Sequence, residues 1–380
     1  CIMKKICRND EKIILERFNV KIVTVVGARP QFIKAAVVSR ELRKKHTEIL
    51  VHTGQHYDYN MSEIFFEELD IPKPDYNLGI SGGTHGQMTG KMLISIEEVL
   101  IKEKPDVLLV YGDTNSTMAA ALAAVKLLIP VVHVEAGNRL GTLSNPEEVN
   151  RIVTDRVSSV RLCCTSSAMD FLKKEGLDAN SYIVGDPMYD AFKYYSEKVG
   201  DKVPEQITGF DDNALLLPDK FYYLTCHRQE NTKDDATLTE ILGAMECLDY
   251  KCVYPVHPRN RERAERVVKN NNFKNIILCQ PVGYLMSVYL TNNCEKIVTD
   301  SGGLQREAFF AGKQCVTVFD YVVWSETMVD NRNQLSKPDK KEILEKISVQ
   351  QTIKENDAFG DGKSAIKIVD IIDDYIKSGE

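Results

Sequence analysis

Asp300-Ser301-Gly302-Gly303-Leu304-Gln305-Arg306-Glu307 is the stretch from which the fold of this chain can be inferred. A largely apolar run at 294–298 leads into it and predicts a short buried parallel strand, while residues 304–310 predict a helix that ends near Gly312. A strand, a Ser-Gly-Gly turn and a helix together direct free backbone N–H groups and the positive end of a helix dipole towards an anion.

The glycines and the acidic residue of this stretch suit a nucleotide ligand. Gly302 and Gly303 carry no Cβ, so a diphosphate can approach the backbone closely. Glu307 lies one helical turn further on and is expected to accept hydrogen bonds from a sugar diol. The alternative is that Ser301 only caps a helix after a Gly-rich turn, and Ser-Gly-Gly alone favours that alternative. The rest of the chain decides between the two.

Length and composition predict a soluble globular protein with room for two domains. The chain has 380 residues, of which 43% are hydrophobic and 27% are charged. The net charge is −7 and no basic block is present, which argues against nucleic acid as the main partner. No apolar run approaches the roughly 20 residues of a membrane span, so no membrane partner is expected.

Cysteine and histidine usage predicts neither disulfides nor a metal site. The ten cysteines are scattered, most of them in apolar runs, and no CxxC pair with metal-ligand spacing appears. We expect reduced, buried thiols in a cytoplasmic protein. The histidines at 46, 52, 56, 85 and 133 are too scattered to form a predicted ligand set. Residues 1–20 lack the apolar core of a secretory signal and are expected to form an extension before the first strand.

The first half alternates between strand and helix patterns. A β-rich run at 21–26 is followed by a turn with Arg29 and Pro30 and by a helix pattern over 31–45. Because Pro30 suits the first turn of a helix, Arg29 and Lys34 are expected near the carboxyl end of a strand and the amino end of a helix. Solvated cations are the ordinary alternative for both. Arg29, in the turn itself, is the better anion ligand.

Three carboxylates are predicted to meet at one edge of the first sheet. Strand patterns at 106–111 and 130–134 lead to Asp113 and Glu135, and Glu147 begins the next helix. Ligands of doubly wound sheets bind outside the carboxyl ends of the strands. Each carboxylate alone could be a helix cap or a surface charge. Together they can take different pKa values, so that one serves as a base and another as an acid.

The second half repeats the alternation and adds two histidines. Strand patterns at 220–226 and 252–256 lead to His227 and His257. A lone histidine at a strand end is more often structural than chemical. His227 opens a dense polar cluster, however, and we interpret it as a ligand of a diphosphate or leaving group. His257, followed by Pro258, is the weaker candidate, with packing as its alternative.

Strand–helix alternation through both halves predicts an α/β fold. We expect two doubly wound, Rossmann-like domains that face a central cleft, which is a GT-B-like architecture. The predicted N-terminal domain spans 21–199, the C-terminal domain spans 200–363, and the polar stretch at 200–219 is the expected linker. A nucleotide cradle in one domain and carboxylates in the other indicate a protein that acts on nucleotide sugars.

An ordered set of motifs runs from about residue 20 to the end of the chain. The motifs are Gly27-Ala-Arg-Pro-Gln-Phe-Ile-Lys34, Gly112-Asp-Thr-Asn-Ser-Thr117, His133-Val-Glu-Ala-Gly137, Pro146-Glu-Glu-Val-Asn-Arg151, His227-Arg-Gln-Glu-Asn231, Pro255-Val-His-Pro258, Asp300-Ser-Gly-Gly-Leu-Gln-Arg-Glu307 and Phe359-Gly-Asp-Gly362. In this order they resemble the non-hydrolysing UDP-N-acetylglucosamine 2-epimerase family. The stretches 54–58, 64–69 and 74–78 are most similar to its branch of UDP-2,3-diacetamido-glucuronate 2-epimerases.

The resemblance implies inversion at C2 of a UDP-sugar without a cofactor, for the synthesis of cell-surface polysaccharide precursors. A carboxylate removes the C2 proton while UDP leaves C1, and UDP then adds back to the 2-acetamidoglucal as a proton reaches the opposite face. Domain motion, a homodimer and a final helix (364–380) that packs on the first domain are also implied. The implied catalytic residues are Asp113, Glu135, Glu147 and His227, and the implied substrate-binding residues are Arg29, Lys34, Arg151, His257, Ser301, Gly302, Gly303 and Glu307.

Departures from the family pattern lie where the sugar end of the substrate would bind. Asn138, the loop 140–145 and the region 331–337 differ from the pattern, and Phe319 stands where an Arg is common. The sugar therefore stays open between UDP-N-acetylglucosamine and its diacetamido-glucuronate counterpart. A UDP-sugar glycosyltransferase, a hydrolysing epimerase and a catalytically silent binding protein are the alternatives. The presence of all four implied catalytic residues favours the non-hydrolysing epimerase.

Overall fold

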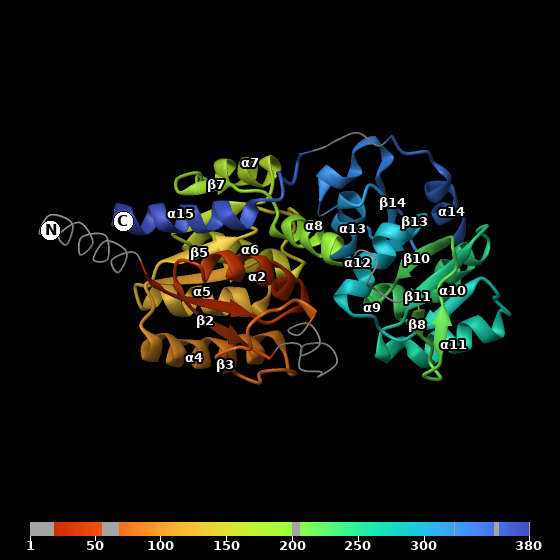
Figure 1. The fold of residues 1–380 in the computed structure, drawn as a ribbon, viewed down its shortest axis with the longest axis horizontal. Helices are drawn as coiled ribbons and strands as arrows, with labels where there is room; N and C mark the ends of the chain where they lie inside the picture. Colours follow the sequence, from red (N-terminus) through yellow and green to blue (C-terminus); the bar gives the residue numbers. More distant parts are fainter. Residues whose placement is uncertain (1–18, 55–67, 200–205, 323, 353–356, 380) are drawn as a thin grey trace, which may run out of the picture. The chain divides into compact units, whose positions relative to one another are not determined.

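The computed structural model describes residues 19–54, 68–199, 206–322, 324–352 and 357–379. The described chain forms two compact units (Figure 1). The chain leaves the first unit between Ala191 and Phe192 and returns to it at Asp357. Most of the predicted N-terminal extension at 1–20 lies outside the described residues, as do most of the stretches 54–58 and 64–69.

The first unit is built on a seven-stranded parallel sheet with the strand order β3-β2-β1-β4-β5-β6-β7. Strand order reverses between β1 and β4, as in a doubly wound sheet. The strands are β1 (Lys21–Val26), β2 (Thr47–His52), β3 (Tyr76–Asn77), β4 (Val107–Tyr111), β5 (Val131–Val134), β6 (Val160–Cys163) and β7 (Ser181–Ile183).

Helices cover both faces of this sheet, so every residue of β4, β5 and β6 is buried (Figure 1). The alanine-rich helix α5 has small side chains, which allow it to pack against both α4 and α6. The helices of this unit are α2 (Arg29–Leu42), α4 (His85–Glu103), α5 (Asn115–Lys126), α6 (Pro146–Val157), α7 (Ser166–Lys174) and α15 (Ser364–Ser378), and α8 (Pro187–Val199) begins in this unit and continues into the second.

The second unit contains a six-stranded parallel sheet with the order β12-β11-β10-β13-β14-β15, which reverses between β10 and β13. Its strands are β10 (Phe221–Thr225), β11 (Lys251–Pro255), β12 (Ile276–Cys279), β13 (Lys296–Thr299), β14 (Gln314–Thr317) and β15 (Asn333–Leu335). Its helices are α9 (Gln229–Thr232), α10 (Asp235–Glu246), η2 (Pro258–Asn260), α11 (Arg261–Asn270), α12 (Tyr284–Asn293), α13 (Gly302–Phe310), η3 (Ser325–Asn331) and α14 (Lys340–Ser348). The predicted α/β class with two Rossmann-like sheets is confirmed.

The stretch expected as a linker contains more structure than its polar composition suggests. β8 (Gln206–Thr208) and β9 (Ala214–Leu216) form a two-stranded antiparallel sheet. Ile207 pairs with Leu215 and both pack into the core beside β10. Two such short strands give no sequence pattern, so the tertiary packing of one apolar pair decides the structure here.

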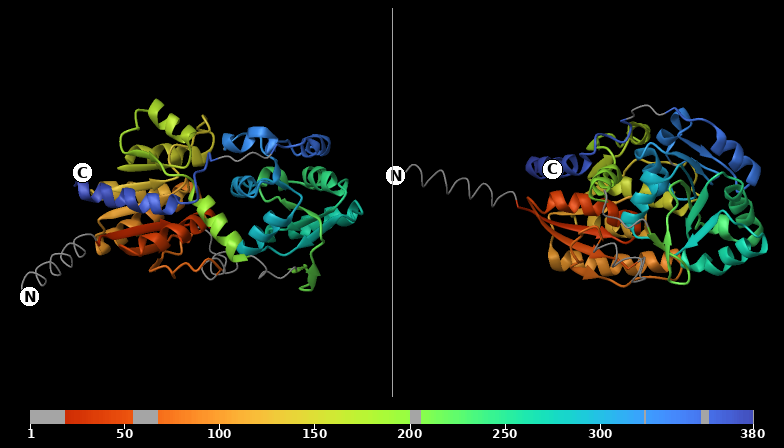
Figure 2. Two further views of the ribbon diagram at one scale, coloured as in Figure 1. Left: turned by 45° about the horizontal axis from the view of Figure 1, so that its top comes forward. Right: turned by 45° about the vertical axis from the view of Figure 1, so that its right-hand side comes forward.

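The C-terminal helix packs on the first unit. α15 lies beside α2 (Figures 1 and 2). Just before α15, the chain passes close to Gly185. The next residue, Asp186, donates its backbone N–H to the carbonyl of Phe359 at 2.9 Å. Gly185 has a φ of +90°, and a Cβ there would lie 2.7 Å from Ser364 Oγ and 2.9 Å from the Phe359 carbonyl oxygen. Only glycine fits this crossing without displacement.

Among the described residues, no helix combines the length and the apolar character needed to cross a membrane. The described cysteines are free thiols, and all but Cys247 are buried.

Gly185→Ala should lower the free energy of unfolding by about 2–4 kcal/mol, because the new methyl group meets both a positive φ and two oxygen atoms. Gly141→Ala is the matched control. Gly141 has a φ of +75° but a Cβ there would meet no described atom within 4 Å. The control should lose only about 1–2 kcal/mol from the backbone conformation. Urea unfolding followed by circular dichroism measures both, and equal losses would contradict close packing at Gly185.

Candidate active site

The polar loops of the first unit gather where its strand order reverses. β1 and β4 are neighbours in the sheet. The connection after β1 leads to β2 on one side of this pair, and the connection after β4 leads to β5 on the other side. The half-buried Arg29 follows β1 as the first residue of α2. Asp113 follows β4, and Glu135 follows β5, whose Val134 pairs with Tyr111 of β4. The structure therefore brings Arg29, Asp113 and Glu135 to one edge of the sheet.

One buried amide connects the loops after β1 and β4. Gln31 Oε1 accepts hydrogen bonds from the backbone N–H groups of Gly27 at 2.8 Å and Ala28 at 3.0 Å. Gln31 Nε2 donates to the carbonyl of Tyr111 at 2.7 Å and to Thr117 Oγ1 at 2.9 Å. Gln31 thus fixes the turn that carries Arg29 against the turn that carries Asp113. The role of Gln31 was not predicted, because Tyr111 and Thr117 lie far from it in the sequence.

Lys34 and Glu135 form an ion pair that is almost wholly buried. Their side chains are only 3% and 9% exposed. Glu135 has a φ of +69°, which is uncommon for a residue with a side chain and indicates local backbone strain. A Cβ on Gly112 would contact both Lys34 Nζ and Glu135 Oε1, at 3.6 and 3.8 Å. A strained backbone and a buried cation therefore fix this carboxylate beside the loop that carries Asp113.

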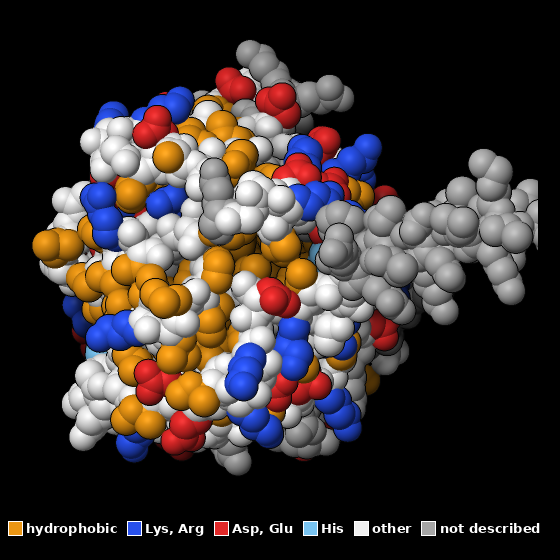
Figure 3. Space-filling view, turned by 90° about the vertical axis from the view of Figure 1, so that its left-hand side faces the viewer, with side chains coloured by type: hydrophobic (Ala, Val, Ile, Leu, Met, Phe, Trp, Pro, Cys, Tyr) orange, Lys and Arg blue, Asp and Glu red, His pale blue; other side chains and the backbone are white. Residues whose placement is uncertain are grey.

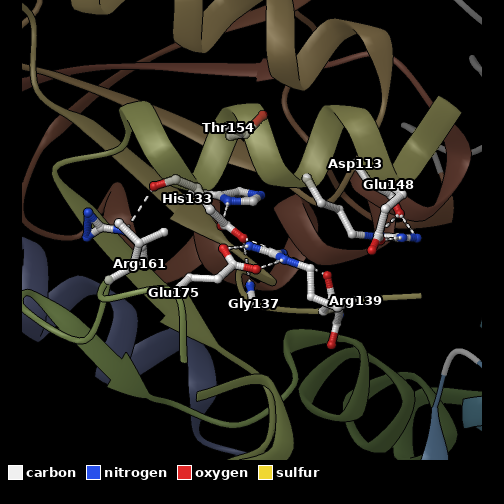
Figure 4. A network of polar contacts seen from close by, with 12 residues as sticks. Asp113, His133, Gly137, Arg139, Glu148, Thr154, Arg161 and Glu175 are labelled. Carbon is white, nitrogen blue, oxygen red and sulfur yellow. Dashed lines mark hydrogen bonds and ion pairs between the residues drawn. The ribbon is translucent and has the colours of Figure 1, made fainter. Parts of the chain in front are cut away.

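Arg151 connects Asp113 to helix α6 (Figure 4). Its Nε and Nη2 donate to Asp113 Oδ2 at 3.0 and 2.7 Å, and its Nη1 donates to Glu148 Oε2 at 2.8 Å. Burial alone would lower the pKa of Arg151, but the two carboxylates raise it above its ordinary value. The guanidinium group, predicted as a substrate ligand, is directed at carboxylates of the protein itself.

Glu147 and Glu148 occupy different environments. Glu147 is exposed in the first turn of α6. Glu148 is 1% exposed, and its Oε1 accepts hydrogen bonds from the backbone N–H groups of Leu140 at 2.8 Å and Gly141 at 3.0 Å. The ion-pair network therefore includes Glu148, which sequence reasoning missed. Its signal was weak, since two adjacent glutamates at a helix start look alike.

A buried histidine belongs to the same network of polar contacts (Figure 4). His133 Nδ1 is 2.7 Å from Asp155 Oδ1, and its Nε2 is 2.7 Å from the carbonyl oxygen of Gly112. Arg139 Nη1 donates to Asp155 Oδ2 at 2.7 Å. Burial alone would raise the pKa of Asp155, but His133 and Arg139 hold it below its ordinary value. His133 thus fixes the backbone just before Asp113.

In the second unit, one buried carboxylate connects the loops after β10 and β13. Asp300 Oδ2 accepts hydrogen bonds from the backbone N–H groups of His227 at 2.9 Å and Arg228 at 2.8 Å. His227 Nδ1 is 3.1 Å from Asp300 Oδ1, which orients the imidazole ring. Burial alone would raise the pKa of Asp300, but the hydrogen bonds and charge of His227 and the N–H of Arg228 lower it. The His227 side chain remains 42% exposed.

The start of α13 is open to a ligand. Ser301 Oγ caps the helix by accepting a hydrogen bond from the backbone N–H of Leu304 at 3.4 Å. A Cβ on Gly302 would meet no described atom within 4 Å, and one on Gly303 would meet only Ser301 Oγ at 3.6 Å. Neither glycine has a positive φ. The packing of the described chain therefore does not require glycine at either position, which is consistent with close approach of a ligand.

The two remaining predicted residues of the second unit are Glu307 and His257. Glu307 is buried on α13, about one turn after Gly303. His257 is half-buried before η2, and its Nδ1 accepts a hydrogen bond from the backbone N–H of Arg259 at 3.4 Å. Arg259 in turn donates to the carbonyl of His227. The structure thus brings His227 and His257 to one edge of the second sheet.

Arg228 is a further residue that the sequence analysis did not single out. Its Nε donates to the carbonyl of Asp300 at 2.9 Å, and its guanidinium carbon lies 4.3 Å from the centroid of the Phe319 ring. Phe319 stacks on Tyr321, whose hydroxyl accepts a hydrogen bond from Arg228. This cation–π contact adds rigidity to the loop that carries His227.

Comparison with known proteins identifies one family. Residues 40–373 match the family model described as UDP-N-acetylglucosamine 2-epimerase. A Methanococcus maripaludis protein named UDP-N-acetylglucosamine 2-epimerase homolog is 47% identical and spans 93% of this chain and 99% of its own length. The UDP-2,3-diacetamido-2,3-dideoxy-D-glucuronate 2-epimerase of Pseudomonas aeruginosa is 45% identical with the same coverage. The UDP-GlcNAc 2-epimerase of Methanocaldococcus jannaschii, solved with UDP-GlcNAc and UDP, has a TM-score of 0.82 at 38% identity, over 93% of this chain and 99% of that chain.

Asp300→Asn should make the stability of the protein less dependent on acid pH. Because the pKa of Asp300 is lower in the folded protein than its ordinary value, its ionised form stabilises the fold above about pH 4. That stabilisation is lost as the pH falls through the folded pKa. The variant should be less stable than the wild type at pH 7, and this difference in the free energy of unfolding should shrink as the pH falls below about 4. Urea unfolding from pH 7 downwards measures the difference, and a constant difference would contradict the assignment.

Proposed function

Because the chain belongs to the UDP-N-acetylglucosamine 2-epimerase family, we propose that it inverts C2 of a UDP-linked 2-acetamido sugar by elimination and re-addition of UDP. It is therefore an isomerase. The observation that best supports this proposal is the distribution of polar groups over the two sheets. Ion-paired carboxylates, half-buried Asp113 and buried Glu135, follow β4 and β5, while an oriented histidine follows β10 and a helix start with two loosely packed glycines follows β13.

The proposed reaction is redox-neutral. A base removes the C2 proton and the C1–O bond to the diphosphate breaks, which leaves a 2-acetamidoglucal and UDP. UDP then re-forms the C1–O bond while an acid protonates C2 on the opposite face. Glu135 and Asp113 are the proposed proton-transfer groups, together with the exposed Glu147. Their environments differ, since Glu135 pairs with Lys34 and Asp113 pairs with Arg151, and different environments suit opposite roles.

The departing diphosphate needs a site for its negative charge. We propose that the backbone N–H groups of Gly302 and Gly303 at the start of α13 bind the diphosphate. His227 is proposed to interact with it through Nε2, the ring nitrogen that does not contact Asp300. Arg29 in the first unit and His257 in the second are further proposed anion ligands. Glu307 is proposed to bind the ribose diol.

Two sugars are candidates for the substrate. The family description favours UDP-N-acetylglucosamine and its manno epimer. The 45% identity to a UDP-2,3-diacetamido-glucuronate epimerase favours the diacetamido sugar. Both have the C2 acetamido group that the reaction requires. A glycosyltransferase, a hydrolysing epimerase and a silent binding protein remain the rivals, and product analysis separates all three.

We further propose that the protein is a homodimer. Ile94 and Ile101, two turns apart on α4, are 58% and 55% exposed, and Leu128 after α5 is 91% exposed with a φ of +60°. Hydrophobic side chains also gather on the side of the first unit seen in Figure 3. Large apolar side chains left at a surface indicate an interaction site.

Ile94→Asp should convert the protein from a dimer to a monomer, because it would bury a charge in the proposed interface. Sedimentation velocity measures the mass of both proteins. A wild type that sediments as a monomer at micromolar concentration would contradict the proposal.

Glu135→Gln should lower turnover by about 100-fold or more, because the amide cannot accept or deliver the proton. Affinity for UDP should stay within about twofold, since most of the proposed diphosphate ligands belong to the second unit and Glu135 is not one of them. Glu307→Ala is the complementary variant and should weaken UDP binding about tenfold, the equivalent of about 1.4 kcal/mol. Proton NMR of the product and calorimetry with UDP measure the two effects. Wild-type turnover in Glu135→Gln would remove Glu135 from the mechanism.

A further inference from the structure

Glu135 belongs to a buried cluster that sequence reasoning did not detect. One oxygen of Glu135, Sγ of Cys164 and one oxygen of Asp186 all lie within 4.8 Å of one another. The exposed fractions of these residues are 7%, 1% and 0%. The three residues follow β5, β6 and β7, which are neighbours in the sheet. The fold therefore brings a second buried carboxylate next to the proposed proton-transfer group.

Lys34 lowers the affinity of Glu135 for a proton, whereas a negative charge on Asp186 raises it. A buried ammonium group in contact with a carboxylate favours the ionised form and makes the carboxylate a weak base. A base that removes a proton from carbon works best when its pKa lies near the working pH. A nearby negative charge has the opposite effect and raises the affinity of a carboxylate for a proton. The carboxylate of Asp186 can therefore offset the effect of Lys34 on the proton affinity of Glu135.

The position of Asp186 supports an ionised side chain. Its Oδ1 accepts a hydrogen bond from the backbone N–H of Met188 at 2.8 Å, in the first turn of α8. A helix start stabilises a negative charge. Asp190, one turn further along α8, has its pKa raised by burial first and also by the charge of Asp186. An oxygen of Glu135 also lies within 4.8 Å of an oxygen of Asp186, which is close enough for a like charge to affect its proton affinity.

The structure assigns Asp186 as a positioning residue that increases the affinity of Glu135 for the proton it transfers. This inference rests on the function proposed above. Among the described residues, Lys34 from α2, Cys164 after β6 and Asp190 on α8 are titratable groups that lie beside the pair. Lys34 already occupies an oxygen of Glu135, so we interpret the cluster as a proton-affinity device rather than a metal site.

Asp186→Asn tests the inference through the pH dependence of kcat/KM. Asparagine has almost the same shape and can still cap α8, so the fold should persist. Without the negative charge, Glu135 should lose its proton more readily. The acid limb of the profile should move at least about one unit to lower pH, and the plateau rate should fall several-fold. If Asp186→Asn does not fold, Asp186→Ser replaces it as the test variant, because serine also caps helices and carries no charge.

Cys164→Ala is the matched control, because it changes the third member of the cluster without removing a carboxylate. Its acid limb should stay within about 0.3 units of the wild type, well below the shift of a lost charge. An acid limb that is unmoved in Asp186→Asn, or moved equally in Cys164→Ala, overturns the inference. Stoichiometric zinc in the purified protein, with activity lost on chelation and restored by Zn²⁺, also overturns it.

Infrared spectroscopy separates this inference from the proposed function. The difference spectrum between Glu135→Gln and its parent isolates the Glu135 carboxyl band, whether or not the protein turns over. That band should titrate at lower pH when the parent carries Asp186→Asn. If the wild type turns over but the band titrates at the same pH in both backgrounds, the inference fails and the function stands. If the wild type is inactive but the band shifts, the proposed function fails alone.

Discussion

The reversal of strand order in each sheet is the constraint on which the rest of the structure depends. Neighbouring strands β1 and β4, and likewise β10 and β13, send their crossovers to opposite sides, which separates the loops at their carboxyl ends. One buried polar side chain then connects the separated loops in each unit. Gln31 does this in the first unit with amide hydrogen bonds, and Asp300 does it in the second with a carboxylate. These two side chains fix the backbone from which the proposed functional groups project.

The two units use charge differently. In the first, each buried carboxylate of the candidate site contacts a cation or backbone N–H groups, as Glu135 does with Lys34 and Glu148 with the 140–141 loop. Such pairing makes burial tolerable and also determines how readily each carboxylate takes a proton. In the second, the charge of Asp300 orients His227, and the start of α13 presents N–H groups. In the proposed function, the proton-transfer groups follow strands of the first sheet and most of the diphosphate ligands follow strands of the second, so one set could be altered without the other.

Much of this arrangement could be predicted from the sequence, and the failures have physical causes. Continuous apolar runs predicted β4 and β5 closely, and the short polar motifs that follow them identified Asp113 and Glu135. The β8–β9 pair could not be predicted, because it depends on a single apolar contact. Glu148 and Asp186 were missed for a different reason. Their environments come from backbone N–H groups and neighbouring strands that only the folded chain brings together.

The most direct test of the account is proton NMR of a UDP-2-acetamido sugar turned over by the protein in D₂O. UDP-N-acetylglucosamine and its 2,3-diacetamido-glucuronate counterpart should be run in parallel. The account predicts a manno-configured UDP-sugar that carries deuterium at C2, with the faster substrate identifying the branch. A product that keeps its original hydrogen at C2 would contradict proton transfer by carboxylates. Free UDP accumulating with a reducing sugar would instead indicate a hydrolysing enzyme.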